Sequence, residues 1–98
     1  MVLSVALEEG FEDDVVVVEV NGRKVFEQNN VSTRTQIGLA ESFEVQVDQT
    51  DVVIEVRVPS RGAAGQTRCT IVDRLHVGVS LQSGDVVFRT SEEPFGYV

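Results

Sequence analysis

Hydrophobic and polar residues alternate along most of this chain with a period of two, which is the pattern of β-strands that bury one face. Residues that favour turns separate the alternating segments, and none of the segments has the period of a helix. Valine dominates these segments, and its branched Cβ suits a pleated sheet better than a helix. The predicted strands cover residues 2–7, 15–20, 23–28, 31–39, 43–47, 52–58, 68–72, 75–81 and 86–90.

The number and spacing of these segments predict the fold class. About eight to nine short strands with no helix between them are typical of an antiparallel β-sandwich of the immunoglobulin-like, fibronectin-like or transthyretin-like kind. The chain has 98 residues, and neither a fixed-period repeat nor a linker divides it. We therefore expect residues 1–98 to form a single β-sandwich domain.

The dipeptide Asn21-Gly22 is the strongest turn signal in the chain, because both residues tolerate the positive φ that a type I′ hairpin turn requires. A two-residue turn at this point fixes the pairing of the flanking strands. Glu19 is then expected opposite Lys24 as a cross-strand ion pair, and Val18 opposite Val25.

The resulting hairpin, Val15–Gln28, is predicted to carry apolar residues on both faces. One face would hold Val16, Val18 and Val25, and the other Val15, Val17 and Phe26. A hairpin that is apolar on both faces is either covered or meets another chain. We therefore expect the partner to be another protein, and specifically a second copy of this chain that associates through this hairpin.

A second hairpin is predicted around the turn at residues 48–51, because its strands match inward residue with inward residue, for example Val45 with Ile54. Pro59 should end the second of these strands, since proline lacks a ladder donor. The following stretch, residues 60–67, is rich in glycine and small residues and is predicted to be a mobile loop.

The net charge of the chain limits the classes of partner that it can bind. Sixteen acidic residues against eight basic ones leave a net charge of −8, which would repel a nucleic-acid backbone or an anionic membrane. The N-terminus lacks the basic and apolar regions of a signal peptide, and no apolar run is long enough to cross a membrane. The default expectation is an acidic, soluble, cytoplasmic protein, or a domain of a longer chain.

Several acidic residues fall in predicted loops. If successive strands alternate in direction, the loops alternate between two ends of the sandwich, and one end collects most of the carboxylates. Ca²⁺ takes six to eight oxygen ligands, so such a cluster suggests a calcium site. The candidate metal ligands are Glu12, Asp13, Asp14, Asp48, Asp51 and Asp73. The alternative is an acidic loop cluster that only keeps the domain in solution.

The remaining chemistry in the sequence is sparse. His76 is the only histidine and is expected on the exposed side of its strand, whereas the single cysteine, Cys69, is expected as a small buried hydrophobe. A nucleophile pair of Cys69 and His76 would need both side chains on one face, and nothing in the sequence places a catalytic partner beside either residue. The terminal aromatics Phe95 and Tyr97 are expected to dock on the sandwich or to anchor a partner.

These observations favour a non-enzymatic binding or protein-interaction module with no catalytic residues and no cofactor-binding residues. A calcium-binding β-sandwich, with Ca²⁺ held by the acidic loops at one end, is the alternative.

Overall fold

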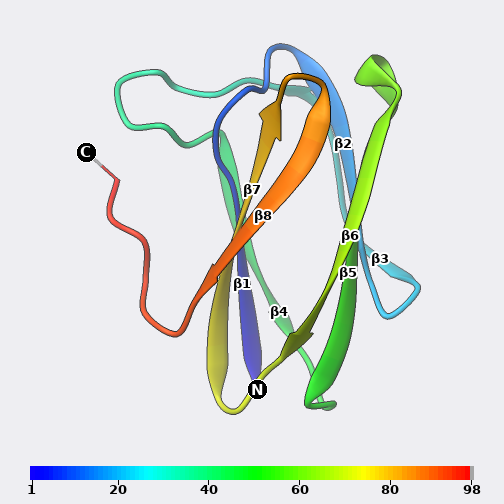
Figure 1. Ribbon diagram of the computed structural model, residues 1–98, viewed down its shortest axis with the longest axis vertical. Helices are drawn as coiled ribbons and strands as arrows, with labels where there is room; N and C mark the ends of the chain where they lie inside the picture. Colours follow the sequence, from blue (N-terminus) through cyan, green and yellow to red (C-terminus); the bar gives the residue numbers. More distant parts are fainter. Residues whose placement is uncertain (98) are drawn as a thin grey trace.

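The computed structural model describes residues 1–97, and these form a β-sandwich of two four-stranded sheets (Figure 1). Sheet A has the strand order β4-β1-β7-β8, and sheet B has the order β3-β2-β5-β6. The strands are β1 (Val2–Leu7), β2 (Asp14–Val20), β3 (Arg23–Val31), β4 (Glu41–Gln46), β5 (Asp51–Val58), β6 (Ala63–Thr70), β7 (Arg74–Gln82) and β8 (Asp85–Ser91). The predicted all-β sandwich is confirmed at this level.

Neighbouring strands pair antiparallel with one exception. β1 pairs in parallel with β7, for example Val5 beside Val77, so the predicted antiparallel pairing holds for the neighbouring strands except this pair. The reason lies in the path of the chain. It leaves sheet A after β1, returns for β4, passes again through sheet B, and re-enters beside β1 with the same direction.

The core lies between the sheets and consists mostly of valine. Most of the alternating positions predicted to point inward are buried, and Phe43 and Val47 are partly buried. The buried positions of β2 and β5 share one cluster with those of β1 and β7. Fully buried members include Leu3, Val16, Val18, Ile54 and Val79. Complete burial of a valine or leucine side chain stabilises the fold by about 1.5–3 kcal/mol, so this cluster is the main source of stability.

The first hairpin turns where the sequence predicts. Asn21 and Gly22 both have positive φ, and Glu19 lies opposite Lys24 as expected. Beyond that pair the register shifts, and Val18 faces Phe26 instead of Val25. A β-bulge of this kind adds one residue to a strand and turns the following side chains to the other face.

The bulge corrects the prediction that Phe26 lies on the same face of the hairpin Val15–Gln28 as Val15 and Val17. Phe26 now packs against the core and stacks on Phe43 of β4, with ring centroids 4.5 Å apart. The predicted ion pair Glu19–Lys24 is also wrong. Glu19 instead pairs with Arg57 of β5, and Lys24 pairs with Glu27 of its own strand.

The strand predicted at residues 31–39 does not form. β3 continues to Val31, and residues 32–40 are a loop with a single bridge between Arg34 and Leu39. Thr33, which fitted the alternating pattern, is held by the β1–β2 loop: its hydroxyl donates to the Glu8 carbonyl and accepts from the Phe11 amide. The loop therefore uses its polar side chains locally and not on the face of a sheet.

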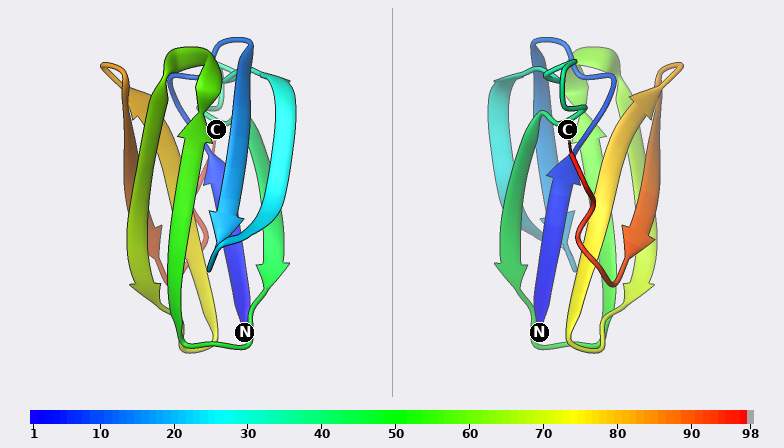
Figure 2. Two further views of the ribbon diagram at one scale, coloured as in Figure 1. Left: turned by 90° about the vertical axis from the view of Figure 1, so that its right-hand side faces the viewer. Right: turned by 90° about the vertical axis from the view of Figure 1, so that its left-hand side faces the viewer.

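The predicted hairpin around residues 48–51 is also corrected, because its two strands belong to different sheets. β4 pairs with β1, where Val45 lies beside Leu3, whereas β5 pairs with β2 and β6. The connection crosses from one sheet to the other at the lower end of the molecule (Figure 2). Both strands still point their apolar side chains inward, which is why alternation alone did not separate the two arrangements.

The stretch predicted to be a mobile loop is ordered. Pro59–Arg61 forms a short 3-10 helix that ends at Gly62, and β6 begins directly after it at Ala63. All eight residues of β6 pair with β5, from Asp51–Thr70 to Val58–Ala63. The glycine-rich composition therefore marks a strand of small side chains and not a disordered connection.

Candidate functional site

The structure does not bring the six predicted metal ligands together. Because the strand predicted at residues 31–39 is a loop, every later strand runs opposite to the predicted direction. Three of the carboxylates lie at the end of the sandwich that holds the β1–β2 loop, and the other three lie at the opposite end (Figure 2). The first group is Glu12, Asp13 and Asp14, and the second is Asp48, Asp51 and Asp73.

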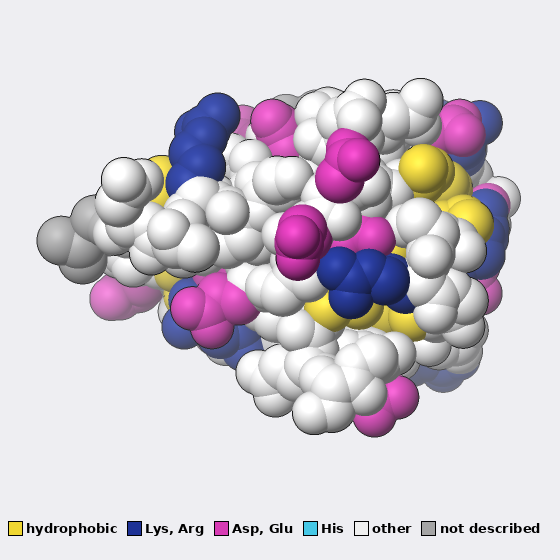
Figure 3. Space-filling view, turned by 90° about the horizontal axis from the view of Figure 1, so that it is seen from above, with side chains coloured by type: hydrophobic (Ala, Val, Ile, Leu, Met, Phe, Trp, Pro, Cys, Tyr) yellow, Lys and Arg dark blue, Asp and Glu magenta, His cyan; other side chains and the backbone are white. Residues whose placement is uncertain are grey.

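Within residues 1–97 no group of three or more histidine, cysteine, aspartate or glutamate side chains is arranged to hold a metal ion. Calcium binding stays a prediction of the sequence. Viewed from above, the end with the β1–β2 loop shows acidic side chains scattered among basic and uncharged ones (Figure 3).

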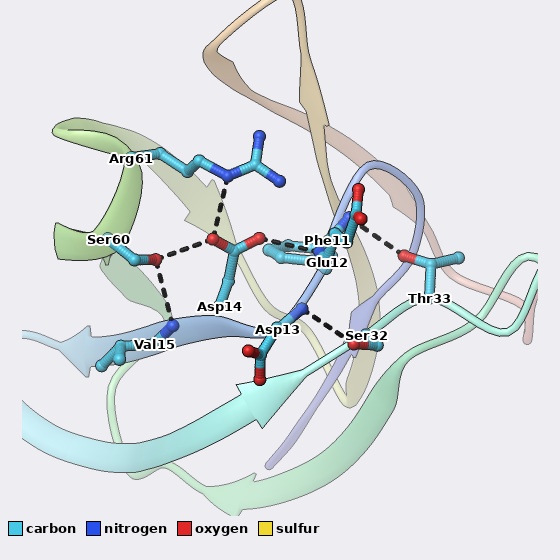
Figure 4. Close-up of polar contacts among 9 residues, drawn as sticks. All are labelled: Phe11, Glu12, Asp13, Asp14, Val15, Ser32, Thr33, Ser60 and Arg61. Atoms are coloured by element: carbon cyan, nitrogen blue, oxygen red, sulfur yellow. Dashed lines mark hydrogen bonds and ion pairs between the residues drawn. The ribbon is translucent and has the colours of Figure 1, made fainter.

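Of Glu12, Asp13 and Asp14, Asp14 has the most side-chain contacts, and these contacts are structural. Its side chain is buried and accepts hydrogen bonds from the Ser60 hydroxyl at 2.7 Å, from Arg61 Nε at 3.0 Å and from the Glu12 amide at 2.8 Å (Figure 4). Burial acts to raise the pKa of Asp14, but these hydrogen bonds and the charge of Arg61 outweigh it and lower the pKa below 3.8. Asp14 therefore ties the start of β2 to the 3-10 turn.

The contacts of the neighbouring residue, Asp13, are also structural. The Asp13 amide donates to the Ser32 hydroxyl at 2.8 Å (Figure 4). The Asp13 carboxylate accepts from the Asn30 side chain. Asp13 has a φ of 52°, a conformation that aspartate and asparagine adopt more readily than most residues. These bonds hold three loops together and give Asp13 and Asp14 a structural role that needs no ligand.

A second buried carboxylate, Glu8, lies on the outer face of sheet A. Both of its oxygens accept from Arg89, with Nε at 2.9 Å and the second nitrogen at 2.6 Å, and Oε2 also accepts from the Tyr97 hydroxyl at 2.5 Å. Its carboxylate rests on Gly78, where a Cβ would lie 2.3 Å from Oε1. A two-pronged Arg–carboxylate pair is a strong and directional contact.

The C-terminal segment Glu92–Tyr97 completes this cluster, as the prediction of docking expects. It leaves β8 at the lower end and runs back across the outer face of sheet A (Figure 2). The Arg89 guanidinium lies 3.9 Å from the centre of the Phe95 ring, and His76 meets the same ring edge-on at 6.4 Å. Burial, followed by the hydrogen bond to Glu8, raises the pKa of Tyr97 well above its ordinary value.

His76 and Cys69 are not brought together. His76 is only partly exposed beneath Phe95, so the expectation of an open surface histidine is wrong, and its Nε2 is buried with no hydrogen-bond partner among the described residues. Cys69 is buried in the core from sheet B, as predicted, and burial raises the pKa of its thiol. The two side chains therefore do not share a face.

Sequence reasoning missed the cluster of Glu8 and Arg89, because these residues are separated by most of the chain. One signal was available in Gly78, an isolated glycine in the middle of a predicted strand. Such a glycine often marks a place where another group approaches the backbone closely.

A different feature occupies the side of the sandwich where β3 and β4 lie. Each of these strands is paired on one side only. A groove of about 510 Å³ opens between them near the lower end, and four valines line its walls together with polar residues of the two adjoining turns. The valines are Val20, Val25, Val45 and Val47. Arg23 stands beside them without an ion-pair partner among residues 1–97.

The opposite side of the sandwich is filled. β6 and β8 approach each other there, and a Cβ at Gly65 would lie 3.0 Å from Val86 and 3.4 Å from Phe88. The two sides therefore differ: at the β3–β4 side the sheets are bridged by the Phe26–Phe43 stack, with the groove below it.

Among residues 1–97 the helical structure is limited to one three-residue turn, and no helix has the length and hydrophobicity that would be needed to cross a membrane. Comparison with known proteins returned no match to a family model, to a curated protein or to a solved structure.

Proposed function

We propose that this chain is a non-enzymatic protein-interaction module that binds through the open side of its sandwich, along β3. The observation that carries the proposal is the groove between two unpaired strand edges, lined by Val20, Val25, Val45 and Val47. An unpaired edge offers backbone donors and acceptors to an added strand, and an adjoining apolar groove can take its side chains. As part of the proposal we assign the sandwich to the immunoglobulin-like, fibronectin-like or transthyretin-like classes.

A role in binding agrees with how the charged residues are used. The two buried carboxylates, Glu8 and Asp14, are each held by an arginine and by further hydrogen bonds. Side chains engaged in this way stabilise the fold and are not poised for proton transfer. The residues around the groove, by contrast, include Arg23, a cation that has no ion-pair partner within the described range 1–97.

A second copy of the chain is the partner that fits β3 best. The bulge and the charged pair Lys24–Glu27 are features that discourage indiscriminate pairing of an edge. If two β3 strands align antiparallel about a point between Val25 and Phe26, however, Lys24 of each copy lies opposite Glu27 of the other. Opposite charges facing each other across strands contribute about 0.2–1 kcal/mol per pair.

The test uses the charge reversal Lys24→Glu and its compensation by Glu27→Lys. In sedimentation experiments over a range of concentrations, we expect the wild type to self-associate. K24E should weaken association about tenfold, because two symmetric attractive pairs become repulsive. The double variant K24E/E27K should restore association, since it restores opposite charges both within and between copies.

Both substitutions are at exposed positions of one strand, so thermal unfolding of all three proteins should be nearly unchanged. The proposal for self-association would be overturned if the wild type stays monomeric at the highest concentration of the sedimentation series. It would also be overturned if K24E associates as strongly as the wild type.

A further inference from the structure

The C-terminal segment Glu92–Tyr97 lies on sheet A as a strap that is held mainly by two side chains. Phe95 is stacked on Arg89, and the Tyr97 hydroxyl is bonded to Glu8. Among the described residues, the segment forms no backbone–backbone hydrogen bond with the sheet, and its one amide contact is local, from Glu93 to the Ser91 hydroxyl. A segment attached in this way can leave the surface without breaking any strand pairing.

The strap fills only part of the space available to it. Next to Tyr97 a hollow of about 600 Å³ continues over the outer face of sheet A, between the β1–β2 loop, the loop of residues 32–40 and the first half of β8. It is lined by apolar and neutral polar side chains as well as by charged ones: Glu9, Ile37, Ser80, Gln82, Val87 and Phe88. A longer extended segment would therefore bury more surface here than the strap does.

The receiving groups are held in place by the sheet itself. Glu8 lies on Gly78 and is fixed by both nitrogens of Arg89, and neither contact depends on the strap. If the strap leaves, this pair still presents a carboxylate oxygen for a hydroxyl donor and a guanidinium face for an aromatic ring. In an extended chain, residues two apart point to the same side, so the pattern Phe-x-Tyr matches both groups at once.

We propose that the outer face of sheet A is a second docking surface, that it takes an extended segment of a partner protein with an aromatic residue two positions before a tyrosine, and that the strap Glu92–Tyr97 is its intramolecular competitor. This surface is separate from the β3 edge, so either proposal can fail alone. The strap has the advantage of its covalent attachment, which corresponds to an effective concentration of about millimolar.

The test uses the 98-residue chain with the substitutions Phe95→Ser and Tyr97→Ser, in which the strap is present but has lost both anchors. Tyr97 is the only tyrosine and the chain has no tryptophan, so this variant contains neither fluorophore. A synthetic peptide with the sequence SEEPFGYV can then be followed through its own tyrosine fluorescence. We expect saturable one-to-one binding to the variant, and binding to the wild type that is weaker by at least about tenfold because the strap competes.

Two controls separate docking from loss of structure. The peptide with alanine in place of its phenylalanine should bind the F95S/Y97S protein more weakly, and adding Gly78→Ala to that protein should reduce binding of the original peptide by moving Glu8. In the intact wild type, ultraviolet titration of Tyr97 should show a pKa above the ordinary value of about 10, which reports that the strap is docked.

The partner chemistry is tested by selection from a random peptide library on the folded F95S/Y97S variant. Enrichment of an aromatic residue two positions before tyrosine supports the proposal. A folded variant that binds neither the peptide nor any library member, a different consensus, or equal binding of the peptide to wild type and variant would overturn it.

Discussion

Asp14 shows how a single acidic residue is fixed by its surroundings. Asp14 is 1% exposed, and its carboxylate connects the β1–β2 loop with Ser60 and Arg61. Replacing Asp14 by asparagine removes the charge and leaves donors of the 3-10 turn without an ionised acceptor. We expect the free energy of unfolding to fall by about 1–3 kcal/mol, measured by denaturant titration. Asp13→Asn is the matched control, and the same loss in both variants would contradict the role of Asp14.

The effect of Asp14 also has a predictable dependence on pH. Its pKa is lower in the folded chain than the unfolded value of 3.8. The stability that it contributes is therefore complete above the unfolded pKa and is lost as the pH falls through the folded pKa. The difference in unfolding free energy between the wild type and D14N should be constant from neutral pH to about pH 5 and should shrink below about pH 4.

Individual side chains were predictable where a local rule applies. The inward positions of the strands, the positive φ of Asn21 and Gly22, and the burial of Cys69 all follow from alternation or turn chemistry. The partner of an ion pair was not predictable in the same way. Glu19 pairs with Arg57, which comes from a strand that is distant in sequence, so the sheet order must be known first.

At the scale of elements, the β1–β2 loop depends on a glycine. Gly10 has a φ of 90°, and a Cβ there would lie 2.1 Å from the Leu81 carbonyl oxygen of β7. Gly22 has a similar φ of 81° but open space around it. We expect Gly22→Ala to cost about 1–2 kcal/mol from backbone strain alone. Gly10→Ala should cost about 1–3 kcal/mol more, because it also forces the loop away from β7.

Thermal or denaturant unfolding of the two glycine variants measures this difference directly. Equal losses would mean that the loop does not pass against β7 as described, since only the steric contact separates the two positions.

Two element predictions failed for physical reasons. The stretch 31–39 alternates like a strand, but it has no partner to complete a ladder, and Thr33 bonds to the neighbouring loop instead. The bulge at Val25 changes which residues face the core, and no turn rule predicts a bulge within a strand. Pattern alone reports the face that a segment would bury, not whether another strand lies beside it.

For the molecule as a whole, alternation predicted the two-layer sandwich but not the sheet order. The inward residues of β4 and β5 would match each other in a hairpin, yet the two strands belong to different sheets. The wrong direction of the later strands then placed six carboxylates at one end, whereas the structure divides them between both. The Glu8–Arg89 cluster, the strap and the β3–β4 groove could be located only after the topology was known.

Amide hydrogen exchange of β3 tests the central claim most directly, because strand addition protects amides that have no partner in the single chain. We expect the amides of residues 24–28 that point away from β2 to exchange rapidly in dilute wild type and to become protected as its concentration rises. In K24E the same protection should require an about tenfold higher concentration, and in K24E/E27K it should return to the concentration range of the wild type. Exchange at one rate in all three proteins at every concentration would contradict an interaction through this edge.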